Sequence, residues 1–127
     1  MLLETRRMDE LTSYEVEGFL GAGGELALIP MGPISGHGAL QLLGMHGHFT
    51  HALSVLAAEP ANALVYPLVH TCYAGAGTAF YGTVSFEVAE QTLILKRIAG
   101  ELGKQGFMRI ALLAEGVPEN LAGMAAA

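Results

Sequence analysis

Charged residues are scarce in this chain. Only 14% of its 127 residues are Asp, Glu, Lys or Arg, while 52% are hydrophobic; an average globular domain has about 25% charged residues. So few charged residues cannot cover the solvent-exposed surface of a monomer. Because monomers rarely expose large apolar patches, we expect the protein to hide surface in a homo-oligomer or a hetero-oligomer.

Basic residues and cysteine are scarcer still. Six Lys and Arg stand against 12 Asp and Glu, which gives a formal net charge of −6. Without a basic stripe, nucleic acid is not an expected partner. Cys72 is the one cysteine and cannot form an internal disulfide, which fits a reducing, cytoplasmic setting. Its simplest role is that of a small buried apolar side chain.

Long apolar runs are also missing. No window reaches the roughly 18 apolar residues of a membrane span. The N-terminal segment MLLETRRMDE has early acids and none of the apolar stretch of a signal peptide. We therefore expect no membrane association and a cytoplasmic location. The length suits a single domain that covers residues 1–127.

Helical and strand-like segments alternate along the chain. Three segments have helical periodicity, and three short apolar runs have the length and the flanking Gly or Pro of buried strands. The expected helices cover residues 9–20, 47–58 and 86–103, and the expected strands cover 25–30, 63–69 and 107–113. This alternation predicts an α/β fold with three layers, α/β/α, around a mainly parallel sheet.

Two of the expected helices have recognisable faces. Phe49, Leu53 and Leu56 share one side of the helix at 47–58, and Ser85 is a candidate N-cap for the helix at 86–103. The main stripe of that last helix is Val88, Thr92, Leu95, Ala99 and Leu102, and its second apolar side is Leu93, Ile94 and Ile98. Two apolar sides suggest packing against two layers, which we interpret as the sheet and a neighbouring subunit.

The histidines gather where such a fold builds its sites. Ligands of parallel sheets bind beyond the carboxyl ends of the strands, which here lead into loops at 31–46, 70–82 and 114–120. The segment GPISGHGALQLLGMHGHFTH, residues 32–51, holds four of the five histidines and no carboxylate. They are His37, His46, His48 and His51.

Each histidine has a functional and a structural interpretation. His37 and His46 are candidate metal ligands or acid–base groups, but the first could equally be a loop hydrogen-bonder and the second a helix cap. His48 and His51 are three apart on a helix and can share a face, as metal ligands or as solvated side chains. On the second loop, His70, Tyr73 and Tyr81 are candidates for contact with a polar substrate.

Three segments of the chain form a recognisable set: GPISGHGALQLLGMH at 32–46, FYGTVS at 80–85 and QGFMRIALLAEGVPEN at 105–120. Together they resemble the N-terminal half of the creatininase family of metal-dependent amidohydrolases. The first loop of that family typically reads Gly-Ser-Thr-Glu-Gln-His-Gly, then eight residues ending in Gly-Thr-Asp; here it reads GPISGHG, then ALQLLGMH. The Phe-Pro-Gly-Thr-Ile-Ser step before a long helix is similar to FYGTVS at 80–85. The segment after that helix is similar to QGFMRIALLAEGVPEN at 105–120. The resemblance spans about residues 8–120, and family members are usually about twice as long.

The resemblance implies a degenerate metal site. Members of the family typically bind two divalent metals with Glu and His of the first loop, the later Asp, and His and Glu of the last loop. Carried over, the first Glu falls on Ser35, the His on His37 and the Asp on His46. The later His falls on Val117 and the later Glu on Glu119. Two adjacent metals need bridging carboxylates, so the resemblance leaves at most one ion, Zn, Fe or Mn, on His37, His46 and Glu119.

Three functions remain open from the sequence. The first is a mononuclear metal-dependent hydrolase of a small polar amide or lactam metabolite, in which His37 and His46 carry the chemistry. The second is a non-catalytic subunit that assembles with a full-length creatininase-like partner. The third is a metal-free isomerase, lyase or cyclase in which the two histidines act as acid and base.

Overall fold

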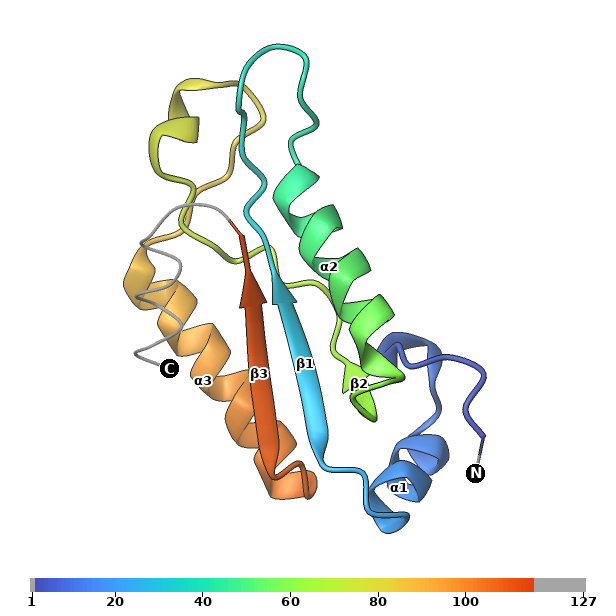
Figure 1. Cartoon of the computed structure of the whole chain (residues 1–127). Coiled ribbons are helices and arrows are strands. Elements are labelled where there is room, and N and C mark those ends of the chain that lie inside the picture. The colour runs from blue at the N-terminus through green and yellow to red at the C-terminus, as the bar shows by residue number, and fades with distance from the viewer. Residues whose placement is uncertain (1, 116–127) are drawn as a thin grey trace.

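The structure, a computed structural model, describes residues 2–115 and places three parallel strands between two layers of helices (Figure 1). In chain order the elements are η1 (Met8–Glu10), α1 (Ser13–Gly21), β1 (Leu26–Met31), α2 (Met45–Ala58), β2 (Ala63–Val65), η2 (Gly75–Ala79), α3 (Val88–Gln105) and β3 (Arg109–Ala114). The α/β class and the parallel sheet predicted from the alternating segments are confirmed.

The central strand of the sheet is β1. The strand order is β2-β1-β3, and Leu26 of β1 pairs with Ala63 on one side and with Arg109 on the other. Every residue of β1 after Leu26 is buried. A parallel strand with helices on both faces has no solvent side, which explains its continuous apolar sequence LALIPM.

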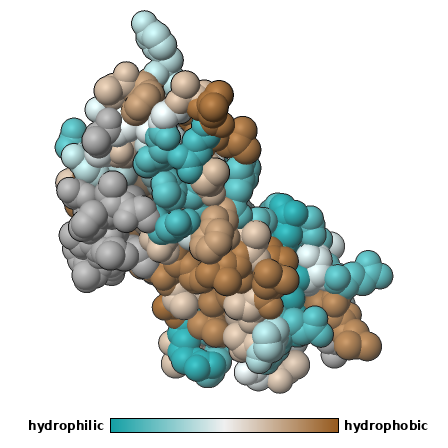
Figure 2. All heavy atoms as spheres, turned by 45° about the horizontal axis from the view of Figure 1, so that its top comes forward, coloured by the Kyte–Doolittle hydropathy of each residue, from teal (hydrophilic) through white to brown (hydrophobic). Residues whose placement is uncertain are grey.

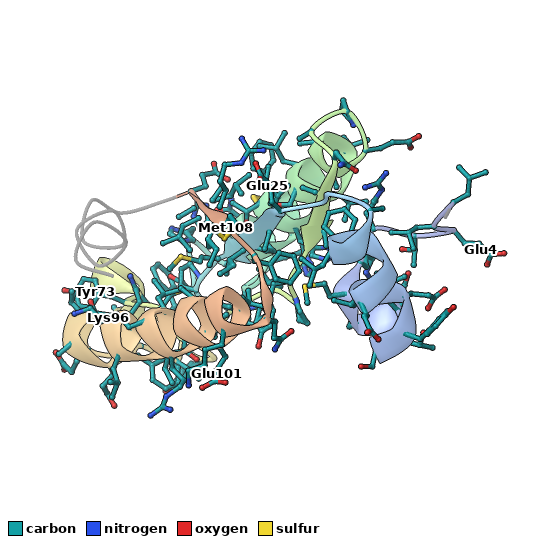
Figure 3. All side chains as sticks on the ribbon, turned by 90° about the horizontal axis from the view of Figure 1, so that it is seen from below. Glu4, Glu25, Tyr73, Lys96, Glu101 and Met108 are labelled. Carbon is teal, nitrogen blue, oxygen red and sulfur yellow. The ribbon has the colours of Figure 1, made fainter. Side chains whose placement is uncertain are left out.

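Each face of the sheet has its own apolar core. Ile29, Met31 and Leu64 point to the side covered by α1 and α3, where they pack with Phe19 and Leu95. Leu28, Ala58, Ala63 and Val65 form the smaller core under α2. Seen from below, α2 lies on one side of the strands and the other two helices lie opposite (Figure 3), which confirms the three-layer arrangement.

Capping sets where the helices begin. The expected helix at 9–20 is split, because Thr12 forms a capping box with Glu15 and starts α1 one residue later, while Met8–Glu10 form a separate 3-10 turn. The Thr12 backbone N–H and then its hydroxyl, both bonded to the Glu15 carboxylate, lower the pKa of that carboxyl.

Two sequence predictions about boundaries are wrong. Ser85 is not the N-cap of α3: that cap is Glu87, in a capping box with Glu90, and the Ser85 hydroxyl instead accepts the backbone N–H of Ala74. Strand β2 is also shorter than the expected 63–69. Pro67 has no N–H to donate, and the pairing resumes only as a single bridge between Val69 and Met31.

Helix α2 turns its small residues inward. Its buried side consists of Gly47, Thr50, Ser54 and Ala58. Phe49, Leu53 and Leu56 do share one side, as predicted, but that side is exposed. On α3 the buried residues are Gln91, Leu95 and Leu102, and Leu93 and Ile94 of the predicted second apolar side are exposed. In the part of the chain that the structure describes, no helix is both long and apolar enough to cross a membrane.

Candidate functional site

The loops after β1 and after β2 are joined into one unit at the carboxyl edge of the sheet. Ile34 and Val84 form an antiparallel bridge. The backbone N–H of Gly36 donates to the Thr83 hydroxyl at 2.9 Å, and that hydroxyl in turn donates to the carbonyl oxygen of Gly77. The loop that holds His37 is therefore fixed to the second loop rather than free.

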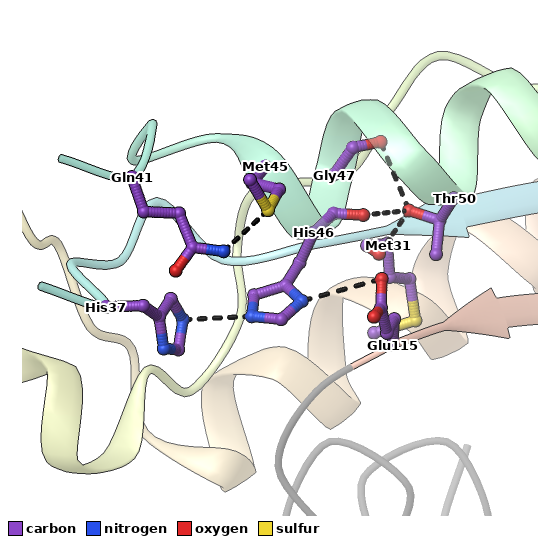
Figure 4. A network of polar contacts seen from close by, with 8 residues as sticks. All are labelled: Met31, His37, Gln41, Met45, His46, Gly47, Thr50 and Glu115. Carbon is purple, nitrogen blue, oxygen red and sulfur yellow. Dashed lines mark hydrogen bonds and ion pairs between the residues drawn. The ribbon is translucent and has the colours of Figure 1, made fainter.

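Within this unit the structure brings His37 and His46 together. Their Nε2 atoms lie 2.9 Å apart, and the rings meet edge to face with centroids at 4.5 Å (Figure 4). His37 comes from the loop after β1 and is exposed, whereas His46 stands in the first turn of α2 and is half-buried. At this distance one nitrogen donates a hydrogen bond to the other.

The end of β1 holds the first turn of α2 in place. The Thr50 hydroxyl lies 2.8 Å from the carbonyl oxygen of Met31, the last residue of the strand, and 2.9 Å from that of His46 (Figure 4). Thr50 is buried, so this link is shielded from water. It fixes the backbone of His46 relative to the sheet.

A carboxylate that the sequence analysis missed completes the arrangement. Glu115 follows β3 directly, and its Oε2 lies 3.5 Å from Nδ1 of His46. This Nδ1 is buried and has no hydrogen-bond partner within hydrogen-bonding geometry, so we regard the contact as a long polar contact with a neutral imidazole. A carboxylate there favours the proton on Nδ1, which leaves Nε2 of His46 as an acceptor and makes His37 the donor.

The signal that could have identified Glu115 was its position. It lies one residue beyond the third strand, inside the loop at 114–120 that was expected to border the site. The family resemblance directed attention to Glu119 instead. Glu119 and Val117 both lie outside the described residues, so the structure does not address their roles.

The other predicted residues are spread around the second loop and α2. Nδ1 of His70 lies 3.1 Å from the carbonyl oxygen of Gly32, at the base of the first loop. Tyr73 is half-buried and its backbone N–H donates to Gln91, whereas Tyr81 is fully exposed. His48 is exposed and lies over Gly44, and His51 is half-buried on α2. The closest pairing of ring nitrogens is that of His37 with His46.

The side chains fit part of one ion site. Two imidazole nitrogens bound to the same tetrahedral ion, each about 2.0–2.1 Å from it, lie roughly 3.3 Å apart, so the 2.9 Å between His37 and His46 would have to widen by a few tenths of an ångström to admit an ion. Among residues 2–115 no group of three His, Cys, Asp or Glu side chains could hold a metal. A third donor must come from elsewhere, which is the part the resemblance gives to Glu119.

The resemblance places the first carboxylate of the family at Ser35, where the structure leaves no room for one. The residue is fully buried, and its hydroxyl has no hydrogen-bond partner. Gly77 lies so close that a Cβ there would overlap the Ser35 hydroxyl. The donor set in the described residues therefore does not fit two adjacent ions.

Cys72 is excluded as a nucleophile by its surroundings. It is fully buried. Burial raises the pKa of its thiol to about 11, although a hydrogen bond from the backbone of Gly32 acts in the opposite direction. A buried neutral thiol is unreactive, as expected from the sequence.

The fold and these side chains define an α/β protein whose functional groups gather beyond the carboxyl ends of parallel strands. The family model Creatininase, described as creatinine amidohydrolase, matches residues 9–121. The chain belongs to the creatininase family, which confirms the resemblance seen in its loops.

Similar proteins cover this chain almost completely but extend well beyond it. The creatinine amidohydrolase of Pseudomonas putida is 30% identical over 109 residues, which are 82% of this chain and 42% of that protein. A crystal structure of creatinine amidohydrolase (creatininase) superposes with a TM-score of 0.89 at 28% identity, over 98% of this chain and 49% of that one. This chain therefore spans about half the length of the relatives it matches.

Two further solved relatives are named for metals. A creatininase structure named for Mn has a TM-score of 0.88 at 28% identity, over 97% of this chain and 49% of that one. A mutant creatininase described as the Zn-Zn type has a TM-score of 0.84 at 26% identity, over 97% of this chain and 51% of that one.

Proposed function

We propose that this chain is a hydrolase of a small polar amide or lactam that uses one divalent ion, Zn, Fe or Mn. The observation that supports this proposal is the 2.9 Å approach of the two Nε2 atoms of His37 and His46 at the carboxyl edge of the sheet. The solved relatives named for Mn and Zn make a divalent ion the natural occupant. Glu119 is the proposed third donor.

Each side chain has a distinct role in this proposal. A bound divalent ion would polarise the substrate carbonyl and activate water. His37 and His46 would hold the ion through their Nε2 atoms, and in a metal-free site the same two nitrogens would instead accept and return a proton. Glu115 orients the ring of His46 through Nδ1, as the outer carboxylates of many metal-binding histidines do. His70 and Tyr73 on the second loop would contact the polar substrate, as would the more exposed Tyr81.

The test is a titration of the metal-free chain with Zn²⁺ or Mn²⁺, followed by calorimetry and by metal analysis after dialysis. We expect one ion per chain. His37→Ala and His46→Ala should abolish binding, and Glu115→Gln should weaken it by about 10–100-fold. His51→Ala is the matched control, because it removes a histidine from the same helix but should leave binding unchanged. Binding that survives His37→Ala would rule out the proposed ligands.

The metal-free alternative gives a different pattern of results. If His37 and His46 act only as acid and base, isomerase, lyase or cyclase activity survives a chelator but is lost in either alanine variant. In the metal-dependent case the chelator removes activity and added Zn²⁺ or Mn²⁺ restores it. Measuring activity with and without chelator therefore separates the two chemistries.

A second candidate function, a subunit that completes a creatininase-like partner, is favoured by strand β3. Its sequence RIALLA is apolar on both faces, as in strands covered on both sides, yet its residues are only half-buried after Arg109. Among the described residues no strand pairs with its outer edge. Unpaired apolar edges invite another strand. In this case the chain alone would bind no ion, but would do so after co-purification with a full-length relative.

A further inference from the structure

The two loops that border the histidine pair, after β1 and after β2, carry no Asp, Glu, Lys or Arg. Apart from Glu59, residues 26–86 contain none of these residue types. The loop after β3 adds Glu115 and Glu119 but no basic residue. The proposed function uses both of these carboxylates, one beside His46 and the other on the ion. No permanently charged side chain on the three loops is therefore left to pair with a substrate.

The first two loops expose apolar side chains instead. Leu40 and Leu42 of the first loop are 99% and 67% exposed, and Phe80 of the second loop is 44% exposed. Both loops lie at the top of Figure 1. In Figure 2, where this end of the molecule is turned toward the viewer, brown apolar side chains stand at the surface among teal polar ones. Apolar side chains around a few polar groups are typical of ligand sites.

Phe80 lies directly against the backbone beside His37. A Cβ on Gly36, the residue before His37, would overlap the Cβ of Phe80, so the two loops are in close contact at this point. Phe80 still keeps nearly half of its surface exposed. A large apolar side chain next to the site histidine is therefore open to a ligand.

The exposed leucines belong to the same anchored loop as His37. The backbone N–H of Ser35 donates to the carbonyl oxygen of Leu43 at 2.9 Å and closes this loop. The Leu43 side chain lies against Gly82 of the second loop, where a Cβ would overlap one of its methyl groups. The loop is thus held at its base, and its exposed leucines keep a fixed position relative to the histidine.

We propose that the substrate of this site carries an apolar, uncharged substituent, which binds against Leu40, Leu42 and Phe80 while the amide or lactam group lies at His37 and His46. This inference rests on the proposed function, which supplies the reacting group. An apolar substituent gains free energy by leaving water for these side chains. A carboxylate on the substituent would lose hydration without meeting a lysine or arginine, and the net charge of −6 disfavours its approach.

The test compares the binding of 2-pyrrolidinone, its N-benzyl derivative and pyroglutamate, a lactam that carries a carboxylate. Dissociation constants are measured by ligand-observed NMR, with the chain metal-free and with Zn²⁺ added. We expect the benzyl lactam to bind at least about tenfold more tightly than 2-pyrrolidinone, and pyroglutamate to bind no better than 2-pyrrolidinone. Hydrolysis of the three lactams by the Zn²⁺-loaded chain is measured in parallel.

Substitutions in the first loop show whether the leucines make the contact. Leu40→Ser combined with Leu42→Ser should remove most of the preference for the benzyl lactam and leave the binding of 2-pyrrolidinone unchanged. Leu42→Lys supplies a cation and should shift the preference toward pyroglutamate. Leu93→Ser and Leu93→Lys are the matched controls, because Leu93 is 66% exposed but lies on α3 beside Lys96 and Arg97. Circular dichroism checks that each variant is folded.

The results separate this inference from the proposed function. Similar binding and similar hydrolysis of all three lactams would support the hydrolase and overturn the apolar substituent. Preferential binding of the benzyl lactam without any hydrolysis would refute the hydrolase and support the apolar binding surface. A preference that survives the two serine substitutions would leave the leucines to a protein partner and overturn the inference. So would a failure of every lactam to bind.

Discussion

Single residues decide how closely the elements of this protein can pack. Gly32 and Gly47 permit backbone contact between the end of β1 and the start of α2. That contact, together with the Thr50 hydroxyl bonded to the carbonyl of Met31, fixes the turn that carries His46. His46 is therefore positioned by residues that take no part in the proposed chemistry.

Gly32→Ala should destabilise the protein by about 3 kcal/mol, because the new methyl group would overlap the backbone of Gly47, which cannot move aside. Gly100→Ala on α3 is the matched control. Nothing lies within 4 Å of a Cβ at Gly100, and alanine favours a helix over glycine by about 0.5–1 kcal/mol, so this variant should be more stable than the wild type. Urea unfolding measures both, and equal effects would contradict the close contact.

The secondary-structure elements follow the sequence pattern, but their orientations do not all follow from it. On α3 the stripe through Leu95 and Leu102 faces the core, as periodicity predicts. On α2 periodicity finds the face of Phe49, Leu53 and Leu56 correctly but cannot say that it points away from the sheet. Close packing on β1 overrides the tendency of large apolar residues to be buried.

Two substitutions on α2 test this orientation: one puts a large side chain on the buried side, and the other puts a small side chain on the exposed side. Ser54→Leu places a large side chain at a fully buried position and should destabilise the protein by about 2 kcal/mol. Leu53→Ser changes the exposed side, and it should destabilise the protein by only about 0.5 kcal/mol through lower helix propensity. Chemical unfolding at low protein concentration measures the two free energies. The reverse order would mean that the helix is turned the other way.

At the scale of the whole molecule, the chain is a member of the creatininase family that leaves some apolar surfaces uncovered. The family model matches residues 9–121 of the chain, and the chain superposes on about half the length of the solved relative. Two of its surfaces are apolar without being fully buried: the outer edge of β3, and the side of α2 that carries Phe49, Leu53 and Leu56.

The sequence by itself determined the α/β class, the parallel sheet, the family and the placing of the histidine-rich loop beyond a strand. These features depend on local periodicity, on Gly and Pro at element ends and on short motifs, all of which lie within neighbouring residues. It also pointed to His37 and His46 as a pair, through the family resemblance.

Only the tertiary structure decided which side of α2 is buried, and which carboxylate meets His46. Glu115 and His46 are far apart in the sequence and approach each other only because β1 and β3 are paired and both end at the same edge of the sheet. The direction of α2 likewise depends on a backbone contact between two glycines that belong to different elements. Contacts of this kind arise from packing in three dimensions, which no local pattern records.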